Sequence, residues 1–508
     1  MNSAMTKTFY VTTAIPYVNA KPHIGFAMEL IQADVLARYH RMRGDETFFL
    51  TGTDEHGSKI DQVAREKGMT NQELVDENAA AFKNLADKMN ASNDYFVRTT
   101  DDDHKRAVQK LWKKLQSQDD IYKDTYEGLY CVGCEAYVLE KDLVDGMCPN
   151  HNKAPEKLKE ENYFFRLSKY GERIKEAIER EELKIVPKSR KHEILAMIKE
   201  GLKDVSFSRP RNILNWGVDV PDDPDQVMYV WCDALPNYIS GIGYETENET
   251  FKKFWPVNAH IIGKDILRFH AAIWIGMLMS AELPLPKAIY VHGFITSEGK
   301  KMSKSLNNVV DPLDYQSKYG ADPLRYFLMK EIPTTDDGDF SKARFEAVYN
   351  GDLANNIGNL VSRVLAMSCK YFDNSVPDGD INYELLQQKA REVWTGYEKS
   401  IAAFDLKKAL EVVESFATYA NKYVEETQPW VLAKEDQIKL AEVLYNLLEM
   451  VRHLSLLLRP FTPTVSDQID EFLGMSEIEH DYSEKKSWGL LKAGTAIKKA
   501  TPLFARID

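Results

Sequence analysis

The sequence predicts an open, doubly wound α/β sheet of the Rossmann type that is split by an inserted segment and followed by a bundle of helices. Three observations predict this fold class. Strand-like and helical patterns alternate from Thr6 to about Gln118, as in half of such a sheet. The alternation stops over residues 119–226 and then resumes. After Tyr319 the strand signal fades and apolar residues recur at helical spacing.

The first strand and helix enclose a string that suits phosphate binding. A strand-like run from Thr8 to Ile15 precedes Pro22-His23-Ile24-Gly25, where an amphipathic helix begins. Free N–H groups and the dipole at a helix N-terminus favour phosphate. His23 adds a side-chain donor, and Gly25, which lacks a Cβ, lets a flat adenine ring approach the backbone. An alternative interpretation is that His23 is only a surface cap and Gly25 only a packing glycine. From this string alone, that interpretation is as good as phosphate binding.

Two pairs of metal-binding residue types stand close together in the inserted segment. Cys131 and Cys134 form a Cys-x-x-Cys turn, and Cys148 and His151 form a Cys-x-x-His turn. Three thiolates and one imidazole at this spacing suit tetrahedral Zn²⁺ and fill all its positions, so we expect a structural site. A disulfide is the weaker alternative, because a cytosolic chain with five cysteines seldom holds one.

The second half of the sheet consists of Val227–Trp231, His260–Ile262 and Ala288–Thr296, and it leads into a loop with two lysines. Gly299 opens this loop, and Lys301-Met302-Ser303-Lys304-Ser305 follows. Lys301 and Lys304 can close over a triphosphate and neutralise the charge that develops as pyrophosphate leaves. A solvated basic loop is the alternative for this string alone. Because both strings occur at the two ends of one α/β domain, a nucleotide-activating enzyme is the first hypothesis.

The C-terminal part predicts a helix bundle. Apolar residues recur at helical spacing in four stretches, Leu353–Tyr371, Tyr383–Phe404, Leu406–Glu425 and Ile438–Leu458.

Composition fits a cytoplasmic enzyme. At 508 residues with 44% hydrophobic content, the chain can bury several cores. No apolar run approaches membrane-spanning length, and the first residues resemble no signal peptide, so we expect neither membrane insertion nor export. The net charge of −13 argues against nonspecific coating of DNA but permits a specific nucleic-acid partner, since local basic patches set that affinity.

Six strings in different parts of the chain resemble one enzyme family. Those at His23 and Lys301 resemble the two signatures of class I aminoacyl-tRNA synthetases. Four others resemble the methionyl-tRNA synthetases within that class: Thr51-Gly52-Thr53-Asp54-Glu55-His56-Gly57, Val230-Trp231-Cys232-Asp233-Ala234, Gly263-Lys264-Asp265-Ile266 and Pro429-Trp430. The resemblance covers nearly the whole chain. The first signature normally closes with a second histidine, where this chain has Phe26, so more of the phosphate binding should fall on Lys301 and Lys304.

The resemblance implies a methionine–tRNA ligase that works in two steps. Methionine attacks the α-phosphate of ATP to give methionyl-adenylate and pyrophosphate, and the terminal ribose of methionine tRNA then takes the methionyl group. His23 would hold phosphate, Lys301 and Lys304 would stabilise the transition state, and Mg²⁺ would bridge phosphate oxygens. The implied ATP-binding residues are His23, Gly25, Glu29, Asp265, Lys301 and Lys304.

The resemblance also implies a methionine pocket. Asp54 matches the carboxylate that holds the substrate ammonium, and aromatic and aliphatic walls suit a soft thioether. Without the family, a plain core role would be the better reading of each aromatic residue. The implied set is Ala14, Ile15, Tyr17, Asp54, Trp231, Ala234, Leu235, Tyr238, Ile266, His270 and Trp274.

By the same resemblance, the helix bundle reads the methionine anticodon. Asn359 and Arg363 lie one helical turn apart and would present an amide and a guanidinium to unpaired bases. Trp430 follows Pro429 in a break between helices, where an indole can stack on a base. A capping tryptophan of the core is the alternative for Trp430.

Five regions are expected: 1–118 and 227–321 as the two halves of the catalytic domain, 119–226 as a zinc-containing connective insertion, 322–354 as a stem-contact linker and 355–508 as the anticodon-binding domain. The expected partners are ATP, L-methionine and methionine tRNA, both initiator and elongator, with no DNA and no membrane. We expect a monomer, because the chain ends soon after the bundle without the extra C-terminal module of some dimeric relatives.

Three other classes of protein fit the sequence less well than a methionyl-tRNA synthetase. Branched-chain class I synthetases carry a much larger editing insertion, and the cysteine enzyme places zinc in its amino-acid site. A nucleotidylyltransferase would share the first string but has no use for the bundle. A noncatalytic tRNA-binding paralogue would keep Trp430 and lose the lysines, whereas Lys301 and Lys304 are present here together with His23 and Asp54.

Overall fold

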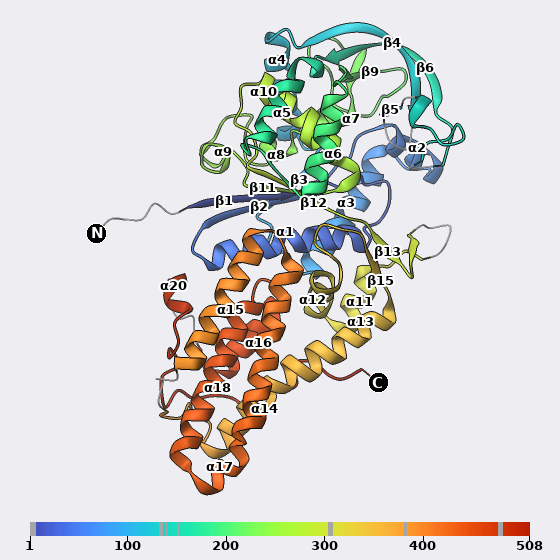
Figure 1. The fold of residues 1–508 in the computed structure, drawn as a ribbon. Coiled ribbons are helices and arrows are strands. Elements are labelled where there is room, and N and C mark those ends of the chain that lie inside the picture. Colours follow the sequence, from blue (N-terminus) through green and yellow to red (C-terminus); the bar gives the residue numbers. More distant parts are fainter. Residues whose placement is uncertain are drawn as a thin grey trace.

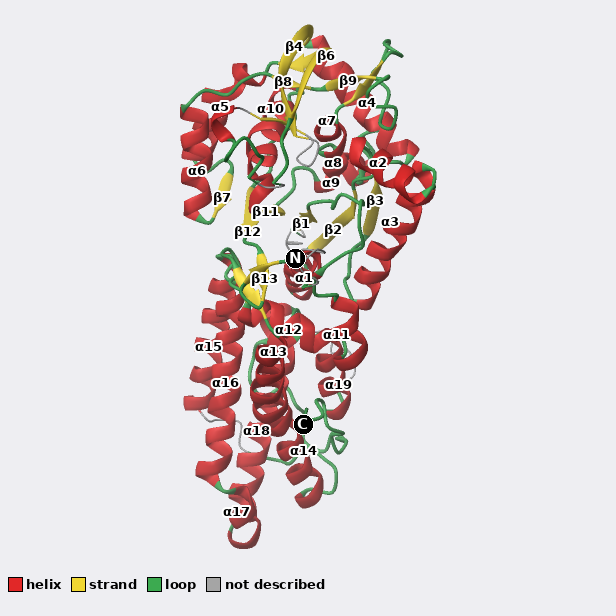
Figure 2. Ribbon diagram, turned by 90° about the vertical axis from the view of Figure 1, so that its right-hand side faces the viewer, coloured by secondary structure: helices red, strands yellow, loops and turns green. Residues whose placement is uncertain are grey.

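The computed structural model has an α/β part and a long helical bundle that extends from one side of it (Figure 1). It describes residues 7–131, 136–138, 140–149, 152–302, 308–379, 384–475 and 481–507. Helix α17 (Pro429–Glu435) lies at the end of the bundle farthest from the central sheet, as Figure 2 shows from another side. Within the described ranges, no helix is both long enough and apolar enough to cross a membrane.

A parallel sheet of six strands forms the centre of the α/β part, in the order β3-β2-β1-β11-β12-β7. All neighbours pair in parallel, which confirms the predicted fold class. The expectation for residues 119–226 needs one amendment, because β7 comes from that segment and pairs with β12 at the sheet edge. The strands are β1 (Thr8–Thr13), β2 (Glu46–Thr53), β3 (Tyr95–Arg98), β7 (Lys184–Val186), β11 (Ala259–Gly263) and β12 (Ala288–His292).

The two faces of this sheet belong to two hydrophobic cores. Phe9 and Val11 lie in the core that continues into the bundle, whereas Tyr10 between them lies in the other core. Adjacent residues of β1 thus point to opposite faces, as the strand period of two requires. The helices of the first core include α1 (Ile24–Met42), α3 (Asn71–Lys88) and α12 (Ala321–Glu331). Those of the second include α4 (Asp102–Ser117), α8 (Asn237–Ser240) and α10 (Ile275–Ser280).

The inserted segment contains an antiparallel sheet with the strand order β5-β4-β6-β8. Two helices follow within the same segment. The elements are β4 (Ile121–Cys131), β5 (Ala136–Val138), β6 (Glu156–Phe165), α5 (Gly171–Glu179), α6 (Lys188–Lys199) and β8 (Val205–Ser206). Strands β9 (Ser208–Pro210) and β10 (Gln226–Met228) return the chain to the α/β part at α7 (Val230–Ala234). Shorter helices there are α2 (Ser58–Lys67) and α9 (Glu249–Phe254).

The strand predicted up to Thr296 is in fact two strands in two sheets. β12 ends at His292, and β13 (Ile295–Ser297) pairs instead with β14 (Lys300–Lys301) and β15 (Gly338–Phe340). Gly293 separates them, because a Cβ there would lie 2.2 Å from the carbonyl carbon of Asp336. The chain continues through α11 (Pro312–Tyr319) and α13 (Lys342–Val348).

The predicted helix bundle is confirmed, and its four predicted stretches agree closely with the observed helices. The first of them is divided into a π-helical part, Tyr349–Gly358, and α14 (Asn359–Tyr371). The others are α15 (Glu384–Ala402), α16 (Leu406–Thr427) and α18 (Gln437–Leu458). α19 (Pro463–Phe472) and the short α20 (Tyr482–Lys485) complete it.

Arg325 of α12 binds both the bundle and α1, the helix that follows the first strand of the sheet. Its side chain is fully buried and forms an ion pair with Asp34 of α1 at 2.6 Å. The same guanidinium donates to the carbonyl oxygens of Phe461 at 2.8 Å and Pro460 at 2.9 Å, between α18 and α19. Because breaking a buried ion pair is costly, this contact fixes the bundle on the helix that His23 begins.

Candidate active site

The predicted site residues gather where the chain leaves two neighbouring strands in opposite directions. β1 connects to β2 on one side, whereas β11 connects to β12 on the other, so β1 and β11 form a switch point. Ligands bind outside the carboxyl ends of the strands at such a point. The segment after β1 carries Ala14, Ile15, Tyr17 and His23, and the segment after β11 carries Asp265, Ile266, His270 and Trp274.

His23 caps the N-terminus of α1. Its Nδ1 accepts a hydrogen bond from the backbone N–H of Gly25 at 3.0 Å. A Cβ on Gly25 would lie 2.8 Å from the Cε1 atom of His23, so the imidazole itself requires glycine there. Desolvation lowers the pKa of His23 below its ordinary 6.5. The ring is therefore neutral at pH 7 and carries its proton on Nε2, which remains available as a donor.

Phe26, the departure from the class signature, packs into the core. It is buried and meets Phe82 of α3 edge to face, with ring centroids 5.0 Å apart. The side chain therefore takes a packing role.

A backbone hydrogen bond links the first predicted string to the part of the chain beyond the second string. Lys301 ends β14, and the N–H of Ile24 donates to the carbonyl oxygen of Val310 at 3.2 Å. The loop that follows β14 thus returns to the residue next to His23. Ser303, Lys304 and Ser305 lie outside the described residues, as does the side chain of Lys301.

Glu29 forms a buried pair with His292, a residue that sequence reasoning missed. Glu29 Oε2 lies 2.8 Å from His292 Nε2, at the carboxyl end of β12. Burial raises the pKa of Glu29. Burial alone would lower the pKa of His292, but the neighbouring Glu29 carboxylate outweighs this effect, and the pKa of His292 is raised. Glu29 Oε1 has no hydrogen-bond partner among the described groups. Asp265 lies near His292, because both side chains are close to Gly263 at the end of β11. The Oδ1 of Asp265 would lie 2.8 Å from a Cβ on Gly263.

Asp54 is held against the segment that follows β1. Tyr17 and Asp54 form an isolated parallel bridge. The N–H of Asp54 donates to the carbonyl oxygen of Pro16 at 2.9 Å, and the N–H of Val18 donates to that of Asp54 at 3.1 Å. The carboxylate is largely buried. A buried carboxylate directly beyond a strand can bind a substrate cation.

His270 and Tyr238, two of the residues predicted to bind methionine, form a buried and uncharged polar pair. Burial lowers the pKa of His270 to about 4, so the ring is neutral at pH 7. Its Nδ1 lies 3.0 Å from the carbonyl oxygen of Ile266 and therefore carries the proton. Its Nε2, 2.6 Å from the hydroxyl of Tyr238, must then accept. Fixed, uncharged groups of this kind suit a neutral thioether.

The other residues of the predicted methionine pocket are aromatic or aliphatic. Trp231 of α7 stacks on Phe269 with ring centroids 3.7 Å apart, a partner that the sequence did not reveal. Ala14, Leu235, Tyr238 and Trp274 belong to one hydrophobic core, and Ile15, Trp231 and Ile266 pack against it. Ala234 is buried next to Leu235. Trp274 is completely buried, so it supports the pocket through the ring of Tyr238, 5.9 Å away, as the core reading expected.

Acidification is expected to destabilise the fold through His270. Because its folded pKa is about 4 and its ordinary value 6.5, the unfolded chain takes up a proton that the folded chain does not. This stability is complete above about pH 6.5 and is lost as the pH falls towards 4, by roughly 2 kcal/mol between pH 7 and pH 5. Thermal unfolding at both pH values measures the loss. His270→Gln should reduce the difference between them, and an equal difference in variant and wild type would contradict this account.

The expected zinc ligands lie partly outside the described residues, which include Cys131 and Cys148 but neither Cys134 nor His151. Cys131 ends β4 and pairs with Ala136 of the antiparallel strand β5. Cys148 lies in a tight turn, in which its carbonyl oxygen accepts from the N–H of Asn152 at 2.8 Å. Both thiols are buried. Within the described residues, no group of three or more His, Cys, Asp or Glu side chains is arranged so that it could hold a metal ion.

Two of the three predicted anticodon residues meet near the far end of the bundle. The guanidinium of Arg363 lies 5.9 Å from the ring centroid of Trp430 and binds Glu425 at 2.7 Å. Trp430 is 39% exposed, which contradicts its alternative reading as a core tryptophan. Asn359 begins α14, one turn before Arg363, and is exposed. An exposed indole beside a guanidinium can stack on an unpaired base.

Comparisons with known proteins agree with this geometry. A family model described as "tRNA synthetases class I (M)" matches residues 9–157 and 150–365, and one described as "Anticodon binding domain of methionyl tRNA ligase" matches residues 376–508. The methionine–tRNA ligase of Caldanaerobacter subterraneus subsp. tengcongensis is 46% identical over 99% of this chain and 80% of its own length. That of Rhizobium meliloti is 42% identical over 99% of this chain and 98% of its own.

Solved structures from Mycobacterium tuberculosis superpose over the whole length. Its methionyl-tRNA synthetase in complex with methionyl-adenylate gives a TM-score of 0.95 at 38% identity and covers 99% of this chain and 100% of that chain. The apo form gives 0.88 at 36% identity, with 100% of both chains covered.

The switch-point site, the helical bundle and the matched models define an ATP-dependent aminoacyl-tRNA synthetase of class I. Within that class, the chain belongs to the methionyl-tRNA synthetase family and is a methionine–tRNA ligase. The anticodon-domain match also removes the nucleotidylyltransferase alternative.

Proposed function

We propose that methionine is activated at the β1–β11 switch point by the residues predicted from the sequence. The observation that supports this best is the convergence there of His23, Asp54 and His270, each beyond the carboxyl end of a strand or at the helix that follows. A methionine carboxylate oxygen attacks the α-phosphorus of ATP, and the bond to the pyrophosphate oxygen breaks. Positioning and charge stabilisation are sufficient for such chemistry, so no side-chain nucleophile is needed.

The ATP half of the site consists of His23, Gly25, Glu29, Asp265, Lys301 and Lys304. The Nε2–H of His23 donates to phosphate, since its Nδ1 is occupied by the helix cap. Glu29 Oε1 and the exposed Asp265 accept ribose hydroxyls, which would satisfy the unpartnered oxygen of Glu29. Mg²⁺, bound together with ATP, supplies further neutralisation of the phosphate charge.

The methionine half pairs one carboxylate with a neutral pocket. Asp54 binds the substrate ammonium, and the His270–Tyr238 pair with the stacked Trp231 receives the thioether side chain. The remaining wall is formed by Ala14, Ile15, Tyr17, Ala234, Leu235, Ile266 and, behind Tyr238, Trp274.

The second step uses the tRNA. A terminal ribose hydroxyl attacks the carbonyl carbon of methionyl-adenylate, and AMP leaves. At the far end of the bundle, Asn359, Arg363 and Trp430 recognise the anticodon of initiator and elongator methionine tRNA. Glu425, which pairs with Arg363, would have to release that guanidinium for a base or phosphate.

His23→Asn separates the two roles proposed for His23. Asparagine keeps an acceptor for the N–H of Gly25 but lacks a donor at the position of Nε2. We expect kcat for methionine-dependent ATP–pyrophosphate exchange to fall roughly 10- to 100-fold, since a hydrogen bond to a charged group is worth about 1.5–3 kcal/mol. The melting temperature should stay unchanged. His23→Gln, with a donor near Nε2, should recover part of the rate, and a wild-type rate for the asparagine variant would refute the phosphate role.

A structural Zn²⁺ bound by Cys131, Cys134, Cys148 and His151 is also part of the proposal. The buried Cys131 at the end of β4 and the buried Cys148, whose carbonyl oxygen accepts from Asn152, support it. Such a metal would hold the two turns of the insertion together. We expect about one zinc per chain by atomic absorption, and its loss in Cys148→Ser but not in the control Cys369→Ser. A metal-free wild-type protein would contradict the proposal.

We further propose that the chain acts as a cytoplasmic monomer with the domain boundaries given above. The proposed start of the anticodon domain at residue 355 is close to the limits of the two family models, which end and begin at residues 365 and 376. Light scattering of the purified chain tests the monomer directly, and a mass near twice 58.2 kDa would contradict it.

A further inference from the structure

A fully buried carboxylate lies between two histidines beside the proposed methionine pocket. Asp233 Oδ2 is 2.6 Å from His56 Nδ1, and Asp233 Oδ1 is 2.9 Å from His104 Nε2. Asp233 is 0% exposed, and both imidazoles are buried. Burial alone would raise the pKa of Asp233, but the two histidines outweigh it and hold that pKa at about 2. The carboxylate is therefore ionised and accepts an N–H from each ring.

These three residues join the two halves of the methionine pocket. His56 lies two residues beyond Asp54, the carboxylate proposed to bind the ammonium. Asp233 lies in α7 between Trp231 and Ala234, which form part of the side-chain wall. The bond between His56 and Asp233 thus sets the distance from the end of β2 to α7. The ring of Trp216 packs edge-on against His56, with centroids 5.3 Å apart, and holds it from the other side.

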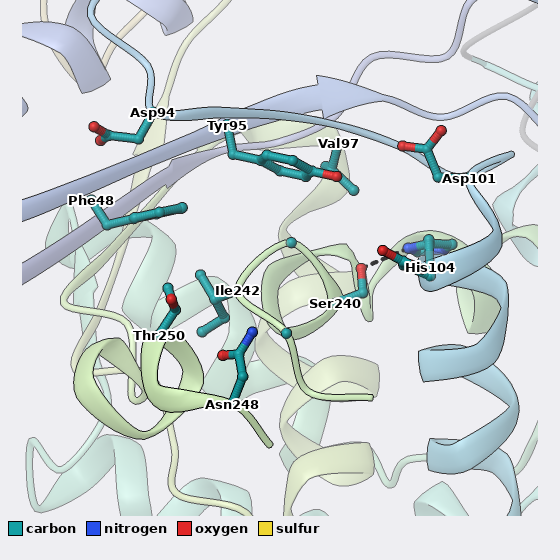
Figure 3. Close-up of a pocket in the computed structure, with 13 residues that line it drawn as sticks. Phe48, Asp94, Tyr95, Val97, Asp101, His104, Ser240, Ile242, Asn248 and Thr250 are labelled. Atoms are coloured by element: carbon teal, nitrogen blue, oxygen red, sulfur yellow. Dashed lines mark hydrogen bonds between the residues drawn. The ribbon is translucent and has the colours of Figure 1, made fainter. Parts of the chain in front are cut away.

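His104 of α4 extends the network to the wall of a separate pocket. Its Nδ1 lies 2.8 Å from the hydroxyl of Ser240, and Figure 3 shows this bond at the edge of the pocket. The cavity has a volume of about 310 Å³ and shares no residue with the proposed methionine pocket. The network is therefore anchored on α4 and α8, on the side of Asp233 opposite His56.

We propose that Asp233 is a positioning residue for methionine binding, a role that rests on the proposed function of Asp54 and Trp231. A buried charge is costly, and apolar packing would serve stability as well or better. Two directional, charge-assisted hydrogen bonds instead fix α7 relative to Asp54. The ammonium and the side chain of methionine can then be bound at the same time, so loss of the network should weaken methionine binding far more than ATP binding.

Asp233→Asn tests this role, because an amide offers one acceptor oxygen where two imidazole N–H groups need partners. In ATP–pyrophosphate exchange we expect KM for methionine to rise at least tenfold, with KM for ATP and kcat changing less than threefold. This pattern is that of lost substrate binding. A proportional fall in activity without a change in methionine KM, or an equal rise in both KM values, would overturn the proposal.

His56 supplies a second test that does not depend on the folding of Asp233→Asn. His56→Asn keeps a donor at the position of Nδ1 and should retain methionine KM within threefold, whereas His56→Ala should raise it at least tenfold. Equal KM values for these two variants would refute the positioning role. Asp54→Asn separates this result from the function itself: if that variant binds methionine normally, the proposed role of Asp54 is wrong.

Glu449→Gln is the matched control. Glu449 is also fully buried, and it forms an ion pair with Arg452 at 2.8 Å, but it lies in α18 of the bundle. The variant should lose stability on thermal unfolding and keep its methionine KM. If it raises methionine KM as much as Asp233→Asn does, the effect is a general result of destabilisation and the proposal fails.

Discussion

Asp54→Asn is expected to lower kcat/KM for methionine about 10²- to 10³-fold in ATP–pyrophosphate exchange. Asp54 is largely buried. Two hydrogen bonds fix its backbone to Pro16 and Val18, so its carboxylate is held in one place. Removing one partner of a buried charge pair costs roughly 2–5 kcal/mol, because the other charge is left unpaired. The substrate ammonium would be that charge.

The measurement is the exchange rate as a function of methionine concentration. Asp87→Asn is the control, because Asp87 is an exposed carboxylate on α3 and the change in net charge is the same. It should leave kcat/KM within twofold of wild type. A small effect of Asp54→Asn, similar to that of the control, would mean that another group binds the ammonium.

Lys304→Ala is expected to slow the exchange reaction by about 10³-fold. The described residues on either side of Lys304 are held in place, by the pairing of β14 with β13 on one side and by the bond from Ile24 to Val310 on the other. Because Phe26 packs into the core, His23 is the one imidazole of the first string that can donate a hydrogen bond to phosphate, and charge neutralisation falls on the lysines. Removing a group that stabilises transition-state charge typically costs this much.

Single-turnover formation of methionyl-adenylate measures this effect on the chemical step. Lys300→Ala serves as the control, since Lys300 is exposed and neighbouring residues of a strand point to opposite faces. It should change the rate less than threefold. If both lysine variants slow the reaction equally, the general charge of the hairpin matters and the specific role of Lys304 is refuted.

The sequence predicted the fold well where the pattern is long and regular. The helix that begins after His23 and the long bundle helices are present because apolar residues that recur at helical spacing over many residues are a strong signal. The first of these helices is not amphipathic in the structure, since residues 26–37 are buried on all sides between the sheet and the bundle. β7 was missed because three residues, Lys184–Val186, are too short to show a period, and their pairing with β12 depends on residues more than a hundred positions away. The break at Gly293 was missed because it results from the backbone of Asp336, which is distant in sequence.

The candidate site was predictable in its residue types but not in its contacts. The family resemblance implied His23, Glu29 and His270, whereas their partners Gly25 N–H, His292 and the Tyr238 hydroxyl became evident only in three dimensions. His292 ends a strand, and a polar residue at that position is the one signal that could have suggested it. The Trp231–Phe269 stack had no such signal, because both aromatics fit a core equally well.

ATP–pyrophosphate exchange with each of the twenty amino acids in turn is the most direct test of the central claim. A pocket with one buried carboxylate for the ammonium and a neutral, aromatic lining for the side chain should select methionine. We expect exchange with methionine to exceed that with every other standard amino acid by at least 10²-fold, and Asp54→Asn to abolish most of it. Faster exchange with another amino acid, or none with methionine, would contradict the account.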